Sequence, residues 1–418
     1  MNPLTSVKGM RDILPPGSAI WNQVEAAARR IFTRFNYREI RTPILEETAL
    51  FARGVGEETD IVSKEMYTFE DRDGTSLTLR PENTASVLRA YIQHRLDQES
   101  GLQKLYYMGP MFRRERPQKG RYRQFYQIGA EAIGSDSPAT DAEVIQLVLA
   151  ILDEIGISGY ALLINSVGSK ESRVRYNEIL REALRDIAPR MCGDCQRRAE
   201  TNPLRVLDCK VPADQPFIEQ LPSILDSLDE TDREHFRRVR EFLDDLGIRY
   251  EVRPRLVRGL DYYARTTFEV THGALGAQNA ILGGGRYDGL AEILGSKVAA
   301  PGIGFSIGED RLVMAAEEAR TLTATALDLY VAPMGENALR HAMVLASDIR
   351  KTGVSVEVST ERKLKRMLEI ANKLGARYTL IVGDNEMATR SYALKNMETG
   401  EQSSATRQRL LEHTQWLT

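Results

Sequence analysis

The sequence predicts an α+β protein in which a large antiparallel body precedes a small α/β tail. Before about residue 320, several segments alternate apolar and polar residues at every second position, a pattern typical of half-buried strands. After that point, three short apolar runs alternate with two helices in the order βαβαβ, which predicts a parallel or mixed sheet. At roughly 100–200 residues per domain, the 418 residues leave room for both parts.

The elements of the body follow from local patterns. Residues 21–35 have an amphipathic pattern of helical period, and Arg80-Pro81 ends one strand and begins the next helix, because proline suits a first helical turn. Two strands that flank a basic segment predict a long antiparallel hairpin. The predicted elements are helix 21–35, strands 37–43 and 75–79, helix 82–93, hairpin strands 105–108 and 124–132, and helix 140–155.

An insertion and returning strands complete the body, and a linker leads to the tail. Between about residues 169 and 250 the strand patterns give way to polar, arginine-rich helical sequence. Strands are expected at 250–252, 266–272 and 278–282, and a segment at 302–307 leads into helix 309–319. After linker 321–326, the tail has strands at 327–332, 354–358 and 378–382, and helices at 337–351 and 361–374.

Composition excludes several classes of protein. Hydrophobic residues make up 42% and charged residues 28%, so an intrinsically disordered chain and a disulfide scaffold are excluded. No run approaches the roughly 20 apolar residues of a membrane span, and residues 1–16 lack the apolar core of a secretory leader. The net charge is −3 and there are three cysteines. We therefore expect a cytoplasmic protein with no membrane span.

One basic segment stands out in this mildly acidic chain. Residues 110–125 contain six cationic side chains and one acidic one, Glu115. On the returning strand, alternation places Phe125, Gln127 and Glu131 on one face, which is a poor core and a good polar pocket. Arginine binds phosphate oxygens bidentately. The segment predicts either a phosphate site or a solvated hairpin tip, and the residues alone do not separate the two.

A second segment, residues 256–263, places Arg258 among apolar residues. A guanidinium there needs an anionic partner, which is either Asp261 in a structural ion pair or a ligand phosphate. The adjacent hydroxyls of Tyr262 and Tyr263 also need partners if they are buried.

Glycine-rich sequence and a helix start supply further candidate binding groups. The run 283–285 and the segment 302–311 allow a ligand to approach the backbone closely, although neither has the lysine and hydroxyl of a Walker phosphate loop. Glu82 and Thr84 either cap the helix that they begin or bind a substrate ammonium group.

Three cysteines, Cys192, Cys195 and Cys209, lie within the insertion and have no nearby histidine. Structural zinc sites use four ligands. Because only three are evident, we expect no metal site.

Together these segments resemble the class II aminoacyl-tRNA synthetases, and specifically the bacterial histidyl-tRNA synthetase family. Class motif 1 is similar to Arg41-Thr42-Pro43-Ile44, motif 2 to residues 112–131, and motif 3 to residues 302–311. The class motifs are short and degenerate. Two stretches typical of the histidine-specific family, at 256–269 and 283–288, are more specific signals. The likeness includes residues 8–12 and 202–208 and extends over essentially the whole chain.

The resemblance implies a class II antiparallel-sheet catalytic domain at 1–324 and a C-terminal α/β anticodon-binding domain at 325–418. The catalytic domain would contain a helical insertion at about 169–250 that contacts the tRNA acceptor arm. The family is dimeric, so the resemblance also implies a homodimer with Pro43 of motif 1 at the subunit interface.

The implied function is that of a histidine–tRNA ligase. ATP would activate L-histidine to histidyl-adenylate and pyrophosphate, with Mg²⁺ on the phosphates, and histidine would then pass to the 3′ end of tRNA(His). The alternative is a non-catalytic, synthetase-like regulatory subunit of ATP phosphoribosyltransferase. Such subunits usually lack the anticodon domain and lose the motif 2 arginines, whereas Arg113, Arg121 and the tail are present here.

The resemblance also assigns roles to individual residues. The implied catalytic residues are Arg113 and Arg258. The implied histidine-binding residues are Glu82, Thr84, Arg113, Gln127, Glu131, Arg258, Tyr262, Tyr263 and Tyr287. The implied ATP-binding residues are Arg113, Glu115, Arg121, Phe125 and Arg311. Gln118 and Lys119 would lie near the tRNA acceptor end.

Overall fold

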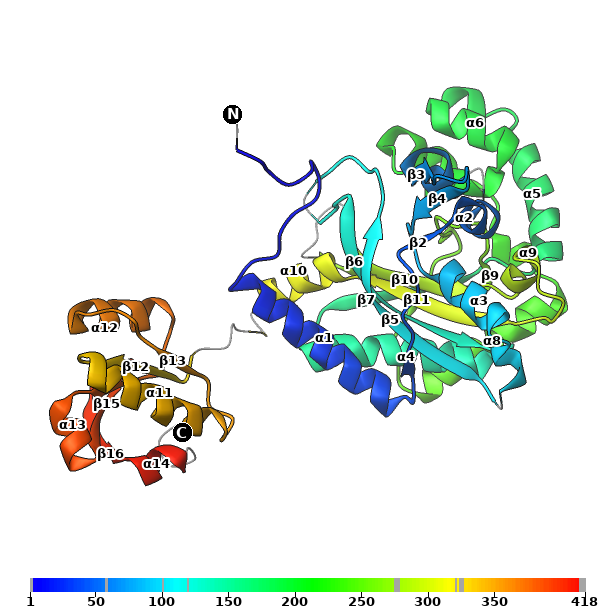
Figure 1. Cartoon of the computed structure of the whole chain (residues 1–418). Helices are drawn as coiled ribbons and strands as arrows, with labels where there is room; N and C mark the ends of the chain where they lie inside the picture. Colours follow the sequence, from blue (N-terminus) through cyan, green and yellow to red (C-terminus); the bar gives the residue numbers. More distant parts are fainter. Residues whose placement is uncertain are drawn as a thin grey trace. The chain divides into compact units, whose positions relative to one another are not determined.

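Three sheets organise the chain, and they belong to two separate units. The structure is a computed structural model that describes residues 3–56, 59–99, 101–118, 120–273, 279–319, 322 and 327–412. The units are Met1–Thr323, with an eight-stranded and a three-stranded sheet, and Ala324–Thr418, with a five-stranded sheet (Figure 1). The predicted α+β class is confirmed. Most of the predicted linker 321–326 lies outside the described residues.

The eight-stranded sheet is antiparallel through its centre and parallel only at its two edges. The predicted hairpin supplies its second and third strands, β5 and β6, and both strands are longer than expected. In spatial order the strands are β1 (Arg38–Glu39), β5 (Gln103–Phe112), β6 (Gln124–Ile133), β11 (Gly302–Gly308), β10 (Ala280–Arg286), β9 (Ala264–His272), β7 (Tyr160–Ser166) and β8 (Glu251–Val252).

Alternation along the central strands separates an apolar face from a polar one. One row across β5, β6, β11, β10 and β9 consists of Tyr106, Ala130, Phe305, Gly284 and Phe268. It packs into the core formed with helices α1 (Gly17–Arg34), α4 (Pro138–Ile155) and α10 (Glu309–Ala319). The next row consists of Tyr107, Gly129, Ser306, Gly283 and Glu269, and it belongs to the opposite face.

Short elements border the polar face. Strands β2 (Leu45–Glu47), β4 (Ser76–Leu79) and β3 (Tyr67–Glu70) form the small sheet. The neighbouring helices are α2 (Thr48–Val55), the π-helical turn η1 (Ile61–Glu65), α3 (Thr84–Gln93), the 3₁₀ turn η2 (Leu96–Gln98) and α9 (Leu290–Ile293). Among the described residues, no helix is long and apolar enough to cross a membrane.

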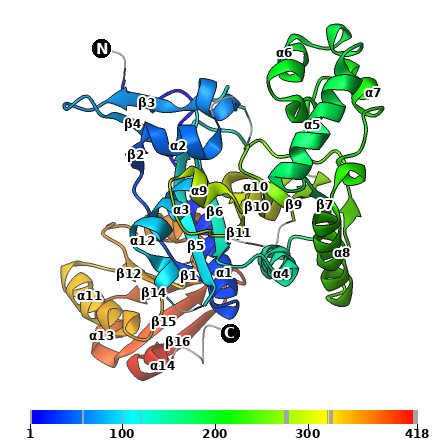
Figure 2. The same ribbon diagram turned by 90° about the vertical axis from the view of Figure 1, so that its right-hand side faces the viewer.

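The predicted insertion is helical and connects β7 to β8. Figure 2 shows its helices as one green group beside β7 and β9. Side-chain caps begin its two long helices: Ser169 accepts a hydrogen bond from the Ser172 amide, and Asp229 accepts one from the Asp232 amide. The elements are α5 (Lys170–Leu184), η3 (Ala188–Arg190), α6 (Gly193–Thr201), η4 (Pro203–Asp208), η5 (Pro212–Asp214), α7 (Gln215–Ile218), η6 (Ile224–Ser227) and α8 (Glu230–Asp245).

The tail forms a mixed sheet, as its βαβαβ pattern predicts. The three predicted strands are β12 (Leu329–Pro333), β13 (Val356–Val358) and β14 (Tyr378–Val382), and they pair in parallel. Two further strands, β15 (Ser391–Asn396) and β16 (Gln402–Thr406), extend the sheet in antiparallel pairing. The helices are α11 (Glu336–Arg350), α12 (Leu364–Lys373), α13 (Asp384–Thr389) and α14 (Arg407–Leu411).

A buried ion pair at the end of β10 joins the sheet to α4. The Arg286 side chain is inaccessible to solvent, and its Nε and Nη2 each donate to Asp141 at 2.7 Å. Its other donors reach the carbonyl oxygens of Ser135 and Ser137 and the carboxylate of Asp288. These bonds fix the turn between β6 and α4 against the sheet.

We predict that Arg286→Met lowers the free energy of unfolding by about 3–5 kcal/mol, because it leaves a buried carboxylate without its partner. Burial raises the pKa of Asp141 to about 6 even with the arginine present. Urea unfolding measures the effect. Asp141→Asn added to Arg286→Met should recover part of the loss, and Asp288→Asn, at a partly exposed carboxylate, should cost less. A wild-type unfolding midpoint for Arg286→Met would contradict the prediction.

Candidate active site

Glycines on the polar face of the eight-stranded sheet lie directly beneath large polar side chains. A Cβ atom at any of four positions would overlap or crowd the side chain above it, so glycine allows these groups to lie against the strands. The pairs are Gly129 with Tyr107, Gly283 with Arg258, Gly285 with Tyr263 and Gly304 with Glu131.

Glu131, on β6, is a buried carboxyl group with few hydrogen bonds to offset the loss of solvent. The Thr84 hydroxyl donates to its Oε1 at 2.7 Å, and its Oε2 makes no hydrogen bond within the described residues. The neighbouring Thr84 and Tyr287 hydroxyls act to lower the carboxyl pKa, although the Tyr287 hydroxyl makes no hydrogen bond within the described residues. Burial dominates and raises the pKa of Glu131 to about 8. The carboxyl group is therefore mostly protonated at neutral pH before a ligand binds.

Glu82 and Thr84 stand at the start of α3, next to Glu131. The Glu82 carboxylate accepts from the backbone amides of Thr84 at 2.7 Å and Ala85 at 3.0 Å, so it does cap the helix. Burial raises its pKa. Each carboxylate oxygen can accept more than one hydrogen bond, so capping leaves room for a ligand ammonium group.

Aromatic side chains lie close to the Glu131 carboxyl group, and together with Glu82 and Thr84 they form the group of residues named the carboxyl pocket. Tyr262 packs against Tyr263 with ring centroids 4.8 Å apart and against Tyr287 edge to face at 6.1 Å. All three rings are buried, and burial raises the pKa of each hydroxyl, so they act as neutral donors and acceptors. The Oε1 atom of buried Gln127 has no hydrogen-bond partner among the described residues.

Arg258 forms its ion pair with Glu269 on β9. The alternative that Asp261 is its structural partner is wrong, and Glu269 was not anticipated, because a partner eleven residues away depends on how the loop folds over the strand. The segment 256–263 contains neither helix nor strand, and only bends and turns precede β9 there.

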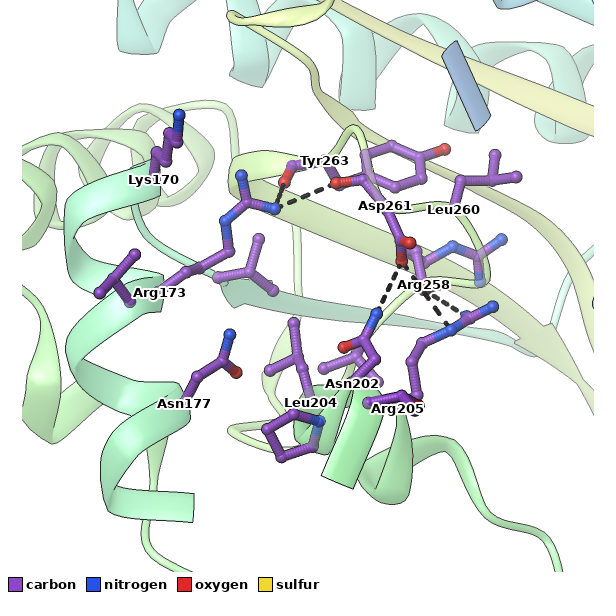
Figure 3. A pocket seen from close by; sticks show the side chains of 15 residues that line it. Lys170, Arg173, Asn177, Asn202, Leu204, Arg205, Arg258, Leu260, Asp261 and Tyr263 are labelled. Carbon is purple, nitrogen blue, oxygen red and sulfur yellow. Dashed lines mark hydrogen bonds and ion pairs between the residues drawn. The ribbon is translucent and has the colours of Figure 1, made fainter. Parts of the chain in front are cut away.

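Two arginines of the insertion hold the Arg258 segment in place. Arg205 on η4 donates to the carbonyl oxygens of Arg258 at 3.0 Å and Gly259 at 2.9 Å. Arg173 on α5 donates to those of Asp261 at 3.1 Å and Tyr263 at 2.7 Å. Figure 3 shows both side chains pointing at the segment across a cavity of about 300 Å³.

Three cationic side chains converge beyond the pocket. Arg113 follows β5, Arg121 lies in the hairpin loop and Arg311 in the first turn of α10. Burial, with repulsion from Arg121 and Arg113, lowers the pKa of Arg311. Glu115 is their near anion, at 3.2 Å from Arg121 and 3.9 Å from Arg113. The Arg113 guanidinium also lies over the Phe125 ring at 5.1 Å. This arrangement suits a polyanion.

Arg113 links this cationic cluster to the carboxyl pocket, because its Nε donates to the carbonyl oxygen of Pro81 at 2.9 Å, beside Glu82. At the far end of the hairpin, Gln118 and Arg121 close a turn through paired backbone hydrogen bonds. Lys119, which was expected near them at the tRNA acceptor end, lies outside the described residues.

The sequence reasoning missed residues that brace the site from a distance. Arg11 pairs with Asp310 at 2.7 Å, and Asp310 also accepts from the Tyr126 amide. Arg80 donates to the carbonyl oxygens of Thr42 and Pro110 and so ties motif 1 to the hairpin. Charged residues beside the recognised motifs were the available signal, but their partners are distant in sequence.

Comparison with known proteins assigns the family. A family model for histidyl-tRNA synthetase matches residues 9–312, well over half of the chain. The chain belongs to the histidyl-tRNA synthetase family. It is therefore an aminoacyl-tRNA synthetase with ATP and histidine as substrates and tRNA as its acceptor. A model for the anticodon binding domain matches residues 328–415, which agrees with the α/β tail.

Individual relatives cover almost the whole chain. The histidine–tRNA ligase of Solibacter usitatus is 70% identical over 404 residues, which are 97% of each chain. The apo histidyl-tRNA synthetase of S. aureus superposes with a TM-score of 0.82 at 39% identity, covering 99% of this chain and 100% of that one.

The regulatory-subunit alternative is not favoured. A Bacillus halodurans protein described as an ATP phosphoribosyltransferase regulatory subunit/histidyl-tRNA synthetase has a TM-score of 0.66 at 22% identity, covering 91% of this chain and 99% of that one. That likeness shows the fold alone. The much more similar Solibacter usitatus relative is a ligase, and the anticodon-binding tail is present.

We predict that Gly283→Ala displaces Arg258 from the sheet, because the added Cβ would overlap its guanidinium. Overpacking of this kind costs about 1–3 kcal/mol, and histidine-dependent exchange of pyrophosphate into ATP should fall as well. Gly17→Ala is the control, since nothing lies within 4 Å of a Cβ there. Equal melting temperatures and exchange rates for both variants would contradict this role of Gly283.

Proposed function

We propose that the carboxyl pocket binds L-histidine and that the adjoining cationic cluster binds ATP, so that histidyl-adenylate forms between them. The observation that carries this proposal is that Arg113 is bonded beside Glu82, next to the Glu131–Thr84 pair, and also belongs to the cationic cluster with Arg121 and Arg311. Transfer of histidine to the 3′ end of tRNA(His) follows. The test is histidine-dependent exchange of pyrophosphate into ATP by the full-length chain. Failure to observe this exchange would overturn the proposal.

In the histidine site, Glu131 and Tyr263 bind the two imidazole nitrogens. A pocket with a partner for each nitrogen rejects apolar isosteres strongly, by about 10⁴-fold or more, since those would leave buried polar groups unpaired. Glu82, Thr84 and Gln127 bind the α-ammonium group. Tyr262 and Tyr287 form the walls, and Arg113 and Arg258 hold the reacting carboxylate and the α-phosphate.

In the ATP site, Arg113 binds the α-phosphate, and Arg121 and Arg311 bind the β- and γ-phosphates. Fixed guanidinium groups stabilise the charge that moves to the departing pyrophosphate. Phe125 stacks on adenine, and Glu115 lies near its amino edge. Because Glu115 pairs with Arg121, a bound triphosphate would replace it as the counterion of that arginine.

The residues present also fit Mg²⁺ bound together with the triphosphate. Magnesium in nucleotide sites is usually held by one or two carboxylates plus phosphate oxygens. Glu115 and Glu269 both act electrostatically on Arg311, which places two carboxylates near the cationic cluster. The ion would supply positive charge to the phosphates, and these two residues would hold it.

We further propose a cytoplasmic homodimer that contacts tRNA through several surfaces. Ile44, Leu45 and Phe69 expose 42–46% of their surface around the small sheet, next to Pro43, which suits a subunit interface. Gln118 and Lys119 would meet the acceptor end. In the tail, α12 and the residues before it carry basic residues that offer phosphate contacts.

We predict that Glu131→Gln raises the KM for histidine or lowers kcat/KM about 10- to 100-fold, the value of one charge-assisted hydrogen bond of about 1.5–3 kcal/mol. Because the pKa of Glu131 is about 8 in the empty protein, wild-type histidine binding should strengthen as pH rises towards 8 and should release the carboxyl proton. Titration calorimetry in buffers of different ionisation enthalpy measures that proton.

Protons that histidine itself gains or loses contribute equally for the wild type and for Glu131→Gln. The difference in proton release between these two proteins therefore reports the Glu131 carboxyl group. The KM for ATP is the internal control and should change little. An unchanged kcat/KM for histidine, with equal proton release, would remove Glu131 from the pocket.

We predict that Arg258→Ala lowers adenylate formation at least about 10²–10³-fold, as loss of a preorganised charge donor does. It should also lower the melting temperature, because Glu269 loses its partner. Adding Glu269→Gln removes the unpaired carboxylate, so the double variant should regain stability. Its pyrophosphate exchange should stay well below that of Glu269→Gln alone, which is the control for the proposed Mg²⁺ role of Glu269. Recovery of both properties together would show that Arg258 is only a structural ion-pair partner.

A further inference from the structure

The three cysteines of the insertion converge on one carboxylate. The sulfur atoms of Cys192, Cys195 and Cys209 and a carboxylate oxygen of Asp214 all lie within 4.8 Å of one another. Apart from the partly exposed Cys192, these side chains are shielded from solvent. We propose that these four residues bind one zinc ion. The expectation that the cysteines hold no metal rested on the lack of a fourth ligand, and Asp214 supplies it.

The distances fit a tetrahedral ion. With zinc–sulfur bonds of about 2.3 Å, the sulfur atoms of a tetrahedral site lie about 3.8 Å apart. Cys192 Sγ and Cys209 Sγ are 3.9 Å apart, and Cys209 Sγ is 3.3 Å from Asp214 Oδ2. Four ligand atoms this close surround one ion and leave no room for a cluster of several metals. Thiolate-rich tetrahedral sites favour zinc among common divalent ions.

Backbone amides already support the negative charge that the ligands would carry. The Val211 amide donates to Cys209 Sγ at 3.4 Å, which favours the thiolate. The Cys192 amide lies 3.1–3.2 Å from the Asp214 carboxylate oxygens and orients that carboxylate. Outer hydrogen bonds of this kind position ligands in metal sites generally. On binding, the three thiols would release their protons and the carboxylate would coordinate directly.

Neither a disulfide nor apolar packing accounts for all four side chains of the cluster. A disulfide needs sulfur atoms about 2.05 Å apart and would leave the third thiol and Asp214 without a role. Simple apolar packing of thiols does not account for a solvent-shielded carboxylate among them, because thiols are only weak hydrogen-bond donors to such a charge. A bound cation satisfies the thiols and the carboxylate together.

The proposed ion would organise short segments that have little other regular structure. It would join the start of α6 to the stretch after η4, and η4 lies in the loop between Cys195 and Cys209. That loop carries Arg205 and Asn202, which bond the Arg258 segment through its carbonyl oxygens and Asp261. Helices of three to nine residues are not stable alone, and structural zinc commonly supplies the missing stability.

The test uses the full-length chain, purified with zinc and desalted into metal-free buffer. Elemental analysis should find one zinc per chain in the wild type and in Asp194→Asn, and less in Asp214→Asn and Cys195→Ser. Asp194 is the matched control, because it is an exposed carboxylate between Cys192 and Cys195 in the sequence. It pairs with Arg197 and is not one of the four proposed ligands. A strong chelator should lower the melting temperature of the wild type, and added zinc should restore it.

Cobalt titration of the wild type and Asp214→Asn keeps the proposal testable if Cys195→Ser does not fold. One equivalent of Co²⁺ should give the thiolate charge-transfer and tetrahedral visible bands, and the carboxylate variant should bind it more weakly. Three free thiols with no bound metal and a melting temperature unaffected by chelator or zinc would overturn the proposal. A disulfide detected by mass in the folded protein would also overturn it.

Discussion

The polar side chains of the active site rest directly on the central sheet, and this is possible only where the strands below them have no Cβ. Gly304 makes room for Glu131, and Gly283 makes room for the Arg258 guanidinium. The same strands must present apolar side chains on their other face to α1, α4 and α10. Two-residue alternation satisfies both demands, so one sheet supports a packed core on one side and a reactive pocket on the other.

The active site consists of two neighbouring parts with opposite electrostatic character, one with buried carboxyl groups and one with crowded arginines. Around Glu131 and Glu82, burial raises the carboxyl pKa values, and the pocket favours a ligand that brings hydrogen-bond donors. Around Arg311, burial together with repulsion from Arg121 and Arg113 lowers the pKa of that arginine, and that end favours an anion. The boundary lies at Arg113, which is bonded to the start of α3. Under the proposed function, a carboxylate and a triphosphate bound on the two sides would meet at this boundary.

Sequence reasoning predicted the features that local pattern determines. The hairpin, the helix at 309–319 and the strand at 378–382 follow from periodicity and turn residues. Phe125, Gln127 and Glu131 fall on one face of β6, as alternation along a strand of unbroken register requires. The pairing of Arg258 with Glu269 and the approach of Asp214 to the cysteines could not be predicted, because both depend on the fold of irregular chain. Strand β7 was missed because its short apolar run precedes the insertion without a clear alternating pattern.

The helical insertion donates hydrogen bonds that hold a segment of the active site in place. The segment 256–263 pairs with no strand, so its carbonyl oxygens need donors from elsewhere. Arg173 and Arg205 supply four such bonds from two different helices of the insertion. Arg258, Tyr262 and Tyr263 are therefore positioned by elements that contribute no strand to the sheet. A change in how α5 or η4 is held, by tRNA or by an ion, would reach the histidine pocket through these four hydrogen bonds.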